Sequence, residues 1–148
     1  MNENPTGPTA EQVKLVRASY ELVVPIADVA SDLIYQRIFE LAPAARDLFP
    51  SDLRAQKHRL MSAIGAAVEL LDRPEELAQV LGRLGARHVR YGVVAEHFPI
   101  VGQAVLWTLE QGLGEAFTPE VRDAWAAVYG AITDLMLVGM RDAELATV

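Results

Sequence analysis

The chain has 148 residues, 51% of them hydrophobic, and we expect a single domain with one buried core. Its formal net charge of −7 argues against nucleic acid or an anionic membrane surface as a partner. The sequence contains no cysteine, which excludes disulfides, thiolate catalysis, zinc–thiolate sites and iron–sulfur clusters. No apolar run is long enough to span a bilayer and the N-terminus is not a secretory signal, so we expect a cytoplasmic location.

The N-terminal part of the chain carries two helical patterns and the start of a third. Thr9 and Gln12 have the spacing of a capping box, in which each side chain bonds the backbone of the other residue. Helical periodicity then continues over residues 13–25. A second apolar pattern covers residues 26–40, and Pro43 can occupy the first position of a short helix.

Four further helices are predicted in the rest of the chain, and no segment shows the alternation of a strand. A long stripe over residues 52–71 includes Gln56 and predicts a buried helix. The next helix begins near Pro74, another covers residues 96–112, and Thr118 caps the last one. The sequence therefore predicts an all-α domain over residues 1–148, flexible only at residues 1–8 and 143–148.

His88 stands at the end of an apolar helical stripe. Leu77, Leu81, Leu84 and His88 share one helix face, and Gly92 follows as a helix terminator. One ring nitrogen can donate to a carbonyl one turn earlier, such as that of Leu84, and this leaves the other nitrogen to bind a metal. The arrangement suits an axial haem ligand. A histidine on such a face is more often a hydrogen-bonded core residue, so the stripe alone leaves both interpretations open.

The other two histidines lie in different segments, which makes a local multi-histidine metal site improbable. His58 follows Gln56 by two positions and is therefore rotated by roughly 200° around the helix. We expect His58 to be exposed.

Four sequence blocks, in this order, resemble the globins, specifically the globin domain of flavohaemoglobins and their single-domain bacterial relatives. The blocks are DLIYQRIFELAPAARDLF (32–49), QKHRLMSAIGAAV (56–68), ARHVRYGVVAEHFPIVGQAVL (86–106) and DAWAAVYGAI (123–132), and the resemblance spans about residues 11–140. It implies a 3-over-3 helical sandwich that encloses a haem pocket. Because the chain has no cysteine, the cofactor would be haem b (iron protoporphyrin IX) held without covalent bonds.

The resemblance also implies roles for individual residues. His88 would be the proximal iron ligand and Phe49 would pack against the haem ring. Tyr35 and Gln56 would face the side where dioxygen binds, with Leu60 as an apolar gate that contacts both cofactor and ligand. Dioxygen takes on partial negative charge at ferrous iron, so a phenol and an amide that donate to it can slow its release. Without the resemblance, Tyr35 would be interpreted as a core tyrosine and Gln56 as a solvent-exposed residue of a helix.

Further residues match positions around the proximal side of the haem. Val93, Val101 and Tyr129 match positions that touch the haem there, and all three are also compatible with an ordinary core. Arg87 either approaches a haem propionate or is solvated. His97 is similar to a residue that recurs in the family before the Pro-Ile-Val-Gly segment, and we expect it to make local hydrogen bonds.

Two positions depart from the flavohaemoglobin pattern. That family typically has a tyrosine where this chain has Phe98, a further haem contact, and a glutamate where it has Met140. The tyrosine and the glutamate hydrogen-bond around the proximal histidine and raise its basicity. Because Phe98 and Met140 cannot do so, the sequence weakens the case for peroxidase-like or specialised dioxygenase chemistry.

Three functions follow from the resemblance. The leading hypothesis is a haemoglobin that binds dioxygen reversibly for storage, transport or gas sensing. The alternative is a nitric oxide dioxygenase, which detoxifies nitric oxide and works with an external reductase, because no dinucleotide-binding fingerprint occurs up to Val148. The third is a haem-free regulatory module. Monomer and homodimer both remain open, and a dimer would use the helices at residues 98–110 or 119–140.

Overall fold

The computed structural model describes residues 7–90 and 95–146, and this part of the chain is helical without a strand. The elements are α1 (Ala10–Val23), η1 (Val24–Ile26), α2 (Ala27–Leu41), η2 (Pro43–Leu48), α3 (Arg54–Glu69), α4 (Pro74–Arg90), α5 (His97–Leu113), η3 (Gly114–Ala116) and α6 (Pro119–Ala146), where η denotes a 3-10 helix. The predicted all-α class is confirmed. No helix in the described segments has both the length and the apolar character of a membrane span.

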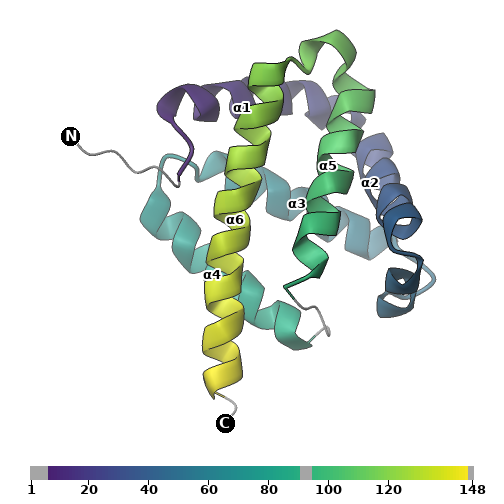
Figure 1. Ribbon diagram of the computed structural model, residues 1–148, viewed down its shortest axis with the longest axis vertical. Helices are drawn as coiled ribbons and strands as arrows, with labels where there is room; N and C mark the ends of the chain where they lie inside the picture. The colour runs from purple at the N-terminus through teal and green to yellow at the C-terminus, as the bar shows by residue number, and fades with distance from the viewer. Residues whose placement is uncertain (1–6, 91–94, 147–148) are drawn as a thin grey trace.

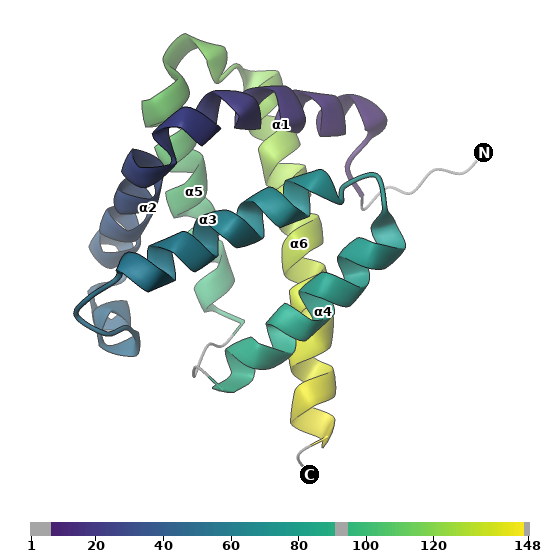
Figure 2. The ribbon, with the colours of Figure 1, turned by 180° about the vertical axis from the view of Figure 1, so that it is seen from behind.

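The six α-helices form two crossing layers of three. Figure 1 shows α5 and α6 in front of α1, α3 and α4, and the view from behind in Figure 2 brings the latter three forward. The second helix, α2, lies beside α5, while both α1 and α4 pack against α6. This is the predicted 3-over-3 helical sandwich.

The helix ends follow signals that the sequence carries. The amide N–H of Gln12 donates to Thr9 Oγ1 over 3.1 Å, and that of Thr9 donates back to Gln12 Oε1 over 3.0 Å, which confirms the capping box of α1. At the start of α6 the amide of Val121 donates to Thr118 Oγ1 over 3.2 Å. The last helix continues to Ala146, so residues 143–146, which the sequence analysis expected to be flexible, are helical.

The larger part of the core lies between α1, α2, α5 and α6 and contains one polar pair. Trp125 Nε1–H donates to Ser19 Oγ over 2.8 Å, and the Ser19 hydroxyl donates to the Leu15 carbonyl over 2.7 Å. Both side chains are buried, and the two bonds satisfy them. The pair therefore joins α1 to α6 through the interior.

The crossing of α4 and α6 is unusually close because glycines form it. A Cβ atom at Gly85 would collide with the backbone of Met136, and one at Gly139 would collide with the backbone of Gly82. The two helices thus meet backbone to backbone, one turn before His88, where α4 passes behind α6 in Figure 1. The helix that carries His88 is fixed against α6 by this crossing.

The third helix differs from its prediction as a buried helix. Only Ala67 and Val68 of α3 are buried, whereas Leu60, Met61 and Ile64 are half-buried although they pack against the core. The reason is its position: α3 runs diagonally across the molecule in Figure 2 and packs mainly against α2 and α1. Its N-terminal half is therefore available to form one wall of a site.

Candidate functional site

The imidazole of His88 is half-buried on α4 and held by a bond to its own helix. Its Nδ1 lies 2.7 Å from the carbonyl oxygen of Leu84, as the sequence analysis predicted. A carbonyl can only accept, so the hydrogen is on Nδ1 and the lone pair is on Nε2. Burial lowers the pKa of His88, and although the Leu84 carbonyl acts in the opposite direction, the ring stays neutral at pH 7. A neutral imidazole in a fixed orientation is the form that binds a metal.

The surroundings of His88 toward α5 and α6 are apolar. The Phe98 ring lies beside the imidazole, with ring centroids 6.4 Å apart and planes inclined by 32°. Phe98 and Met140 are 7% and 5% exposed and belong to the same small core cluster as Leu81 and Met136. The two residues that depart from the flavohaemoglobin pattern therefore lie in one cluster, Phe98 at the start of α5 and Met140 near the end of α6. Neither side chain offers a strongly polar hydrogen-bond acceptor.

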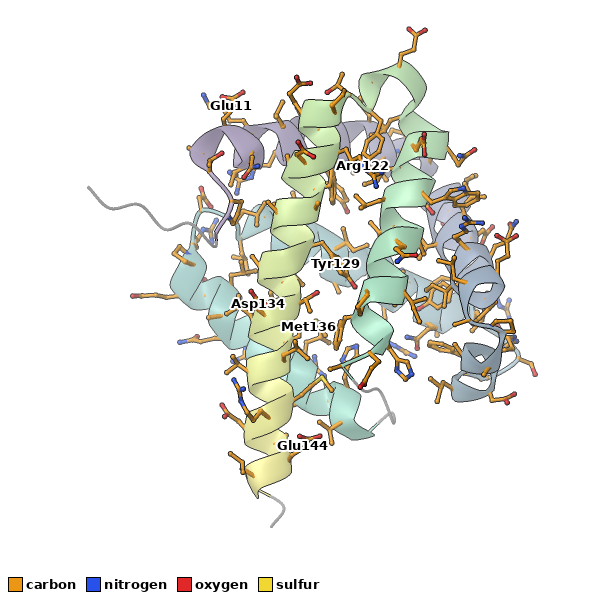
Figure 3. All side chains as sticks on the ribbon, in the orientation of Figure 1. Glu11, Arg122, Tyr129, Asp134, Met136 and Glu144 are labelled. Atoms are coloured by element: carbon orange, nitrogen blue, oxygen red, sulfur yellow. The ribbon has the colours of Figure 1, made fainter. Side chains whose placement is uncertain are left out.

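Tyr129 joins α6 to the start of α5. Its hydroxyl donates to the Phe98 carbonyl over 2.7 Å, and its ring lies against Gly102, where a Cβ atom would collide with it. Figure 3 shows Tyr129 on the side of α6 that faces α5. Burial raises the pKa of Tyr129 to about 12. The resemblance implies that Tyr129 contacts the haem, but nothing local in the sequence predicts a hydrogen-bond partner 31 residues away.

The side chain of Tyr35 is 4% exposed and held among aromatic rings. The Phe49 ring meets it edge-on, with centroids 5.6 Å apart and planes at 86°, and the Phe39 ring lies 6.1 Å away. Such edge-to-face contacts fix the ring position. Burial raises the pKa of Tyr35, so the phenol keeps its proton, and with it a hydrogen-bond donor, over the physiological pH range.

Gln56 lies in the first turn of α3, close enough to Tyr35 for its side chain to lower the pKa of Tyr35 against the larger effect of burial. The Arg59 guanidinium donates to Gln56 Oε1 over 3.0 Å. Tyr35 and Gln56, which the resemblance assigned to one side of the pocket, thus lie together. Arg59 is not among the residues predicted for the site, although its i,i+3 spacing from Gln56 on a helix is a signal for this contact.

An ion pair holds α3 against α2 next to this pair. Lys57 Nζ lies 2.8 Å from Asp32 Oδ1, one position after Gln56 on α3 and three positions before Tyr35 on α2. The Lys57 side chain is 27% exposed, so the contact is partly shielded from water. It limits the distance between the two helices where the polar pair forms.

The remaining candidate residues have the following positions. Val101 is half-buried on α5 and Leu60 is half-buried on α3, and both pack against the main core. His58 and Arg87 are exposed, while His97 is half-buried at the start of α5. Val93 and Gly92 lie outside the described residues.

The donor set and the walls fit a haem group. His88 offers a neutral imidazole with its lone pair on Nε2, Phe49, Leu60 and Val101 offer half-buried apolar surface, and Tyr35 offers a protonated phenol. The elements that carry these residues gather on one side of the molecule: the C-terminal end of α4, the N-terminal ends of α3 and α5, and η2 lie at the lower left of Figure 2. A planar apolar cofactor with a metal needs such a combination.

Comparison with known proteins agrees with this geometry. The Globin family profile matches residues 32–136. The flavohemoprotein of Deinococcus radiodurans is 35% identical over 141 residues, which are 91% of this chain and 35% of that protein. The flavohemoprotein of Bordetella pertussis is 36% identical over 126 residues, 83% of this chain and 31% of that protein. The chain thus spans about a third of the length of the curated relatives that it matches.

Solved structures give the same result. An engineered carbene transferase, derived from a candidate nitric oxide dioxygenase of Rhodothermus marinus, is 27% identical and superposes with a TM-score of 0.81 over 95% of this chain and 96% of that one. A bacterial globin from Campylobacter jejuni has a TM-score of 0.82 over 92% of this chain and 99% of that one, and at 22% identity it supports the fold alone. The chain belongs to the globin family, the haem-binding proteins that share this helical sandwich.

Proposed function

We propose that this globin holds haem b through His88 Nε2 and binds dioxygen reversibly, for storage, transport or sensing of the gas. The observation that carries the proposal is the buried, protonated phenol of Tyr35, with the half-buried amide of Gln56 near it. Donors in this arrangement suit a small ligand that takes on negative charge. Haem, when bound, supplies the iron that takes up dioxygen and polarises it.

Individual residues of the chain would have separate roles in binding the haem and the gas. His88 would hold the iron from the α4 side, with its ring orientation fixed by the Leu84 carbonyl. Phe49 and Leu60 would exclude water and pack against the flat faces and edges of the cofactor. Tyr35 would donate its hydroxyl hydrogen to the gas, and Gln56 would contribute an amide hydrogen. Non-covalent attachment follows because the chain has no cysteine.

A second candidate function is nitric oxide dioxygenase activity, which the names of the relatives favour. In that reaction nitric oxide, dioxygen and one electron give nitrate, and an external reductase would supply the electron. The same Tyr35 and Gln56 would serve this reaction. Phe98 and Met140 argue for the carrier, because neither can polarise the imidazole of His88 and so raise its electron donation.

One experiment tests the proposed function and separates the candidates. The purified protein should show a Soret band, and its oxygenated form should be mixed with nitric oxide in a stopped-flow instrument in the presence of a cellular reductant. A single oxidation without recycling supports the carrier, whereas sustained nitrate production supports the enzyme. Protein that takes up no haem when it is offered would contradict both.

A further inference from the structure

One guanidinium group holds the stretch of chain that follows η2. The side chain of Arg46, on η2, donates to three consecutive carbonyl oxygens, those of Phe49 at 3.3 Å, Pro50 at 3.0 Å and Ser51 at 3.1 Å. A guanidinium carries five N–H donors in one plane, so a single arginine can bond all three oxygens. Residues 49–51 are thus folded around the Arg46 side chain.

The backbone supplies little else to hold residues 49–51. They lie between η2 and α3, and Phe49 has the extended angles φ −125° and ψ 151°. The Phe49 amide donates to the Arg46 carbonyl over 3.2 Å, a bond that any residue at position 46 would keep. Within the described segments no backbone amide donates to the three carbonyls, so their hydrogen bonds come from the Arg46 side chain.

The same stretch carries a ring of the candidate site. The Phe49 ring meets Tyr35 edge-on, with centroids 5.6 Å apart, and it lies 5.9 Å from the Phe39 ring. The Arg46 guanidinium lies over that Phe39 ring, 5.2 Å from its centroid. Arg46 therefore contacts the aromatic cluster twice, through the backbone of Phe49 and through the face of Phe39.

An ion pair does not account for the orientation of Arg46. Its side chain is half-buried, and it takes part in none of the ion pairs found among the described residues, which involve Arg17, Arg37, Arg54, Lys57 and Arg73. A partly desolvated guanidinium needs acceptors for its N–H groups. The three carbonyls supply them, so the loop and the arginine depend on each other.

We propose that Arg46 is a positioning residue, whose guanidinium holds residues 49–51 so that the Phe49 ring keeps Tyr35 in place for a gas in the pocket. Without the guanidinium the three carbonyls lose their partner and the Phe49 ring can leave its edge-on contact with Tyr35. The effect on gas binding rests on the proposed function, whereas the effect on the contact between the two rings does not.

Arg37 supplies the matched control. Its guanidinium also lies over a ring, 5.0 Å from the centroid of Trp107, and it bonds Glu40 over 3.1 Å. Its side chain is 35% exposed, so Arg37→Met removes a half-buried positive charge with a ring contact, but no bond to residues 49–51. Arg46→Lys is the second variant, since it keeps the charge but replaces the planar fork with one ammonium group.

The first test measures the ring contact and does not depend on which gas binds. In the purified isotope-labelled protein, nuclear Overhauser contacts between the rings of Phe49 and Tyr35 are expected in the wild type and in Arg37→Met. In Arg46→Met they should weaken severalfold, and the Phe49 amide should exchange its hydrogen roughly 10-fold faster, because each lost bond shifts a local equilibrium by about 2- to 10-fold.

Two outcomes of this test would overturn the inference. One is a ring contact and an exchange rate that stay unchanged in Arg46→Met. The other is complete restoration of both by Arg46→Lys, because the charge over Phe39 and not the bonds to the three carbonyls would then hold the loop. Partial restoration at most is the expected result.

The second test measures dioxygen release and the C–O stretch of the carbon monoxide adduct. Arg46→Met is expected to speed release by roughly 3- to 10-fold and to shift the stretch, whereas Arg37→Met should change release by less than about twofold. In a Tyr35→Phe background the hydroxyl to be positioned is absent, so Arg46→Met should add less than about twofold.

The double variant separates failure of the inference from failure of the proposed function. Equal acceleration by Arg46→Met with and without the Tyr35 hydroxyl would show that Arg46 does not act through Tyr35, and the inference would be wrong although the protein binds dioxygen. Release that responds neither to Tyr35→Phe nor to Arg46→Met, in a protein where the ring contact is still lost, would contradict the proposed function alone.

Discussion

The hydroxyl of Tyr129 donates to the carbonyl oxygen of Phe98 at 2.7 Å, which ties α6 to the first turn of α5. Phe98 in turn lies beside His88, with ring centroids 6.4 Å apart. The long last helix is thus connected to the candidate ligand through one hydrogen bond and one ring contact. Tyr129 therefore influences the surroundings of His88 through the position of Phe98.

Tyr129→Phe tests the burial of this hydroxyl through the pH dependence of the unfolding free energy. The pKa of Tyr129 is about 12 in the folded chain and about 10 when unfolded, so the stabilisation is complete below pH 10 and is lost between pH 10 and 12. The variant should lose about 1 kcal/mol at pH 7 and show a shallower decline of unfolding free energy above pH 10. Urea denaturation at several pH values measures this slope. A slope in Tyr129→Phe equal to that of the wild type would contradict the assignment.

His88→Ala should abolish most haem binding, because the imidazole with its lone pair on Nε2 is removed. The melting temperature should also fall, since a cofactor that binds only the folded state stabilises it. The exposed His58→Ala is the matched control and should keep both haem content and melting temperature. An unchanged ferrous spectrum in His88→Ala would show that another residue binds the iron.

The lowered pKa of His88 predicts that the fold loses stability and haem at low pH. The pKa of His88 lies below its usual 6.5 in the folded chain, so its neutral form stabilises the fold above pH 6.5. This contribution is lost as the pH falls through the folded pKa, because the unfolded chain takes up the proton more readily. Haem release followed by absorbance should accelerate only below pH 6.5. Release that is faster at neutral pH than at pH 6 would contradict the direction of the shift.

The parts that the sequence predicted correctly are those that depend on neighbours along the chain. The capping box of Thr9 and the bond from His88 to the Leu84 carbonyl both join residues within one helical turn, so spacing alone finds them. The Tyr129–Phe98 bond and the close approach of Gly85 to the backbone of Met136 depend on how two helices cross. No local sequence pattern predicts such a crossing. The roles of the site residues could be predicted only from the resemblance, because a single tyrosine or glutamine in an apolar stripe is compatible with several structural and functional roles.

Tyr35→Phe should speed dioxygen release by roughly 10- to 150-fold, because a hydrogen bond to a charged acceptor contributes about 1.5–3 kcal/mol. The ring stays in place between Phe49 and Phe39, so the cavity shape is retained. Carbon monoxide, which gains less charge, should respond far less. Stopped-flow displacement measures both gases. Equal effects on the two would mean that Tyr35 acts by its size and not by its hydrogen bond.

Phe98→Tyr combined with Met140→Glu tests the apolar surroundings of His88. Both side chains are more than nine-tenths buried, at 7% and 5% exposure, so a phenol and a carboxylate there would be poorly hydrated and would interact strongly with the imidazole. The ferrous iron–histidine stretch should move to higher frequency, and nitric oxide dioxygenase turnover should rise. Phe98→Tyr alone is the control. A high-frequency stretch in the native protein would instead favour the enzyme.

The glycines of α4 give the sharpest test of how the fold positions His88. A methyl group at Gly85 would collide with the backbone of Met136, which cannot move aside as a side chain can, so Gly85→Ala should cost about 1–3 kcal/mol and shift α4 away from α6. At Gly82, one turn earlier, a Cβ atom meets nothing within 4 Å, and alanine is the better helix former by about 1 kcal/mol. Gly82→Ala should therefore be neutral or stabilising, while Gly85→Ala should also weaken haem retention because His88 lies one turn beyond it. Chemical denaturation and haem transfer to an acceptor protein measure both effects. If Gly85→Ala proves as neutral or stabilising as Gly82→Ala, helix propensity and not the backbone contact with α6 governs this crossing.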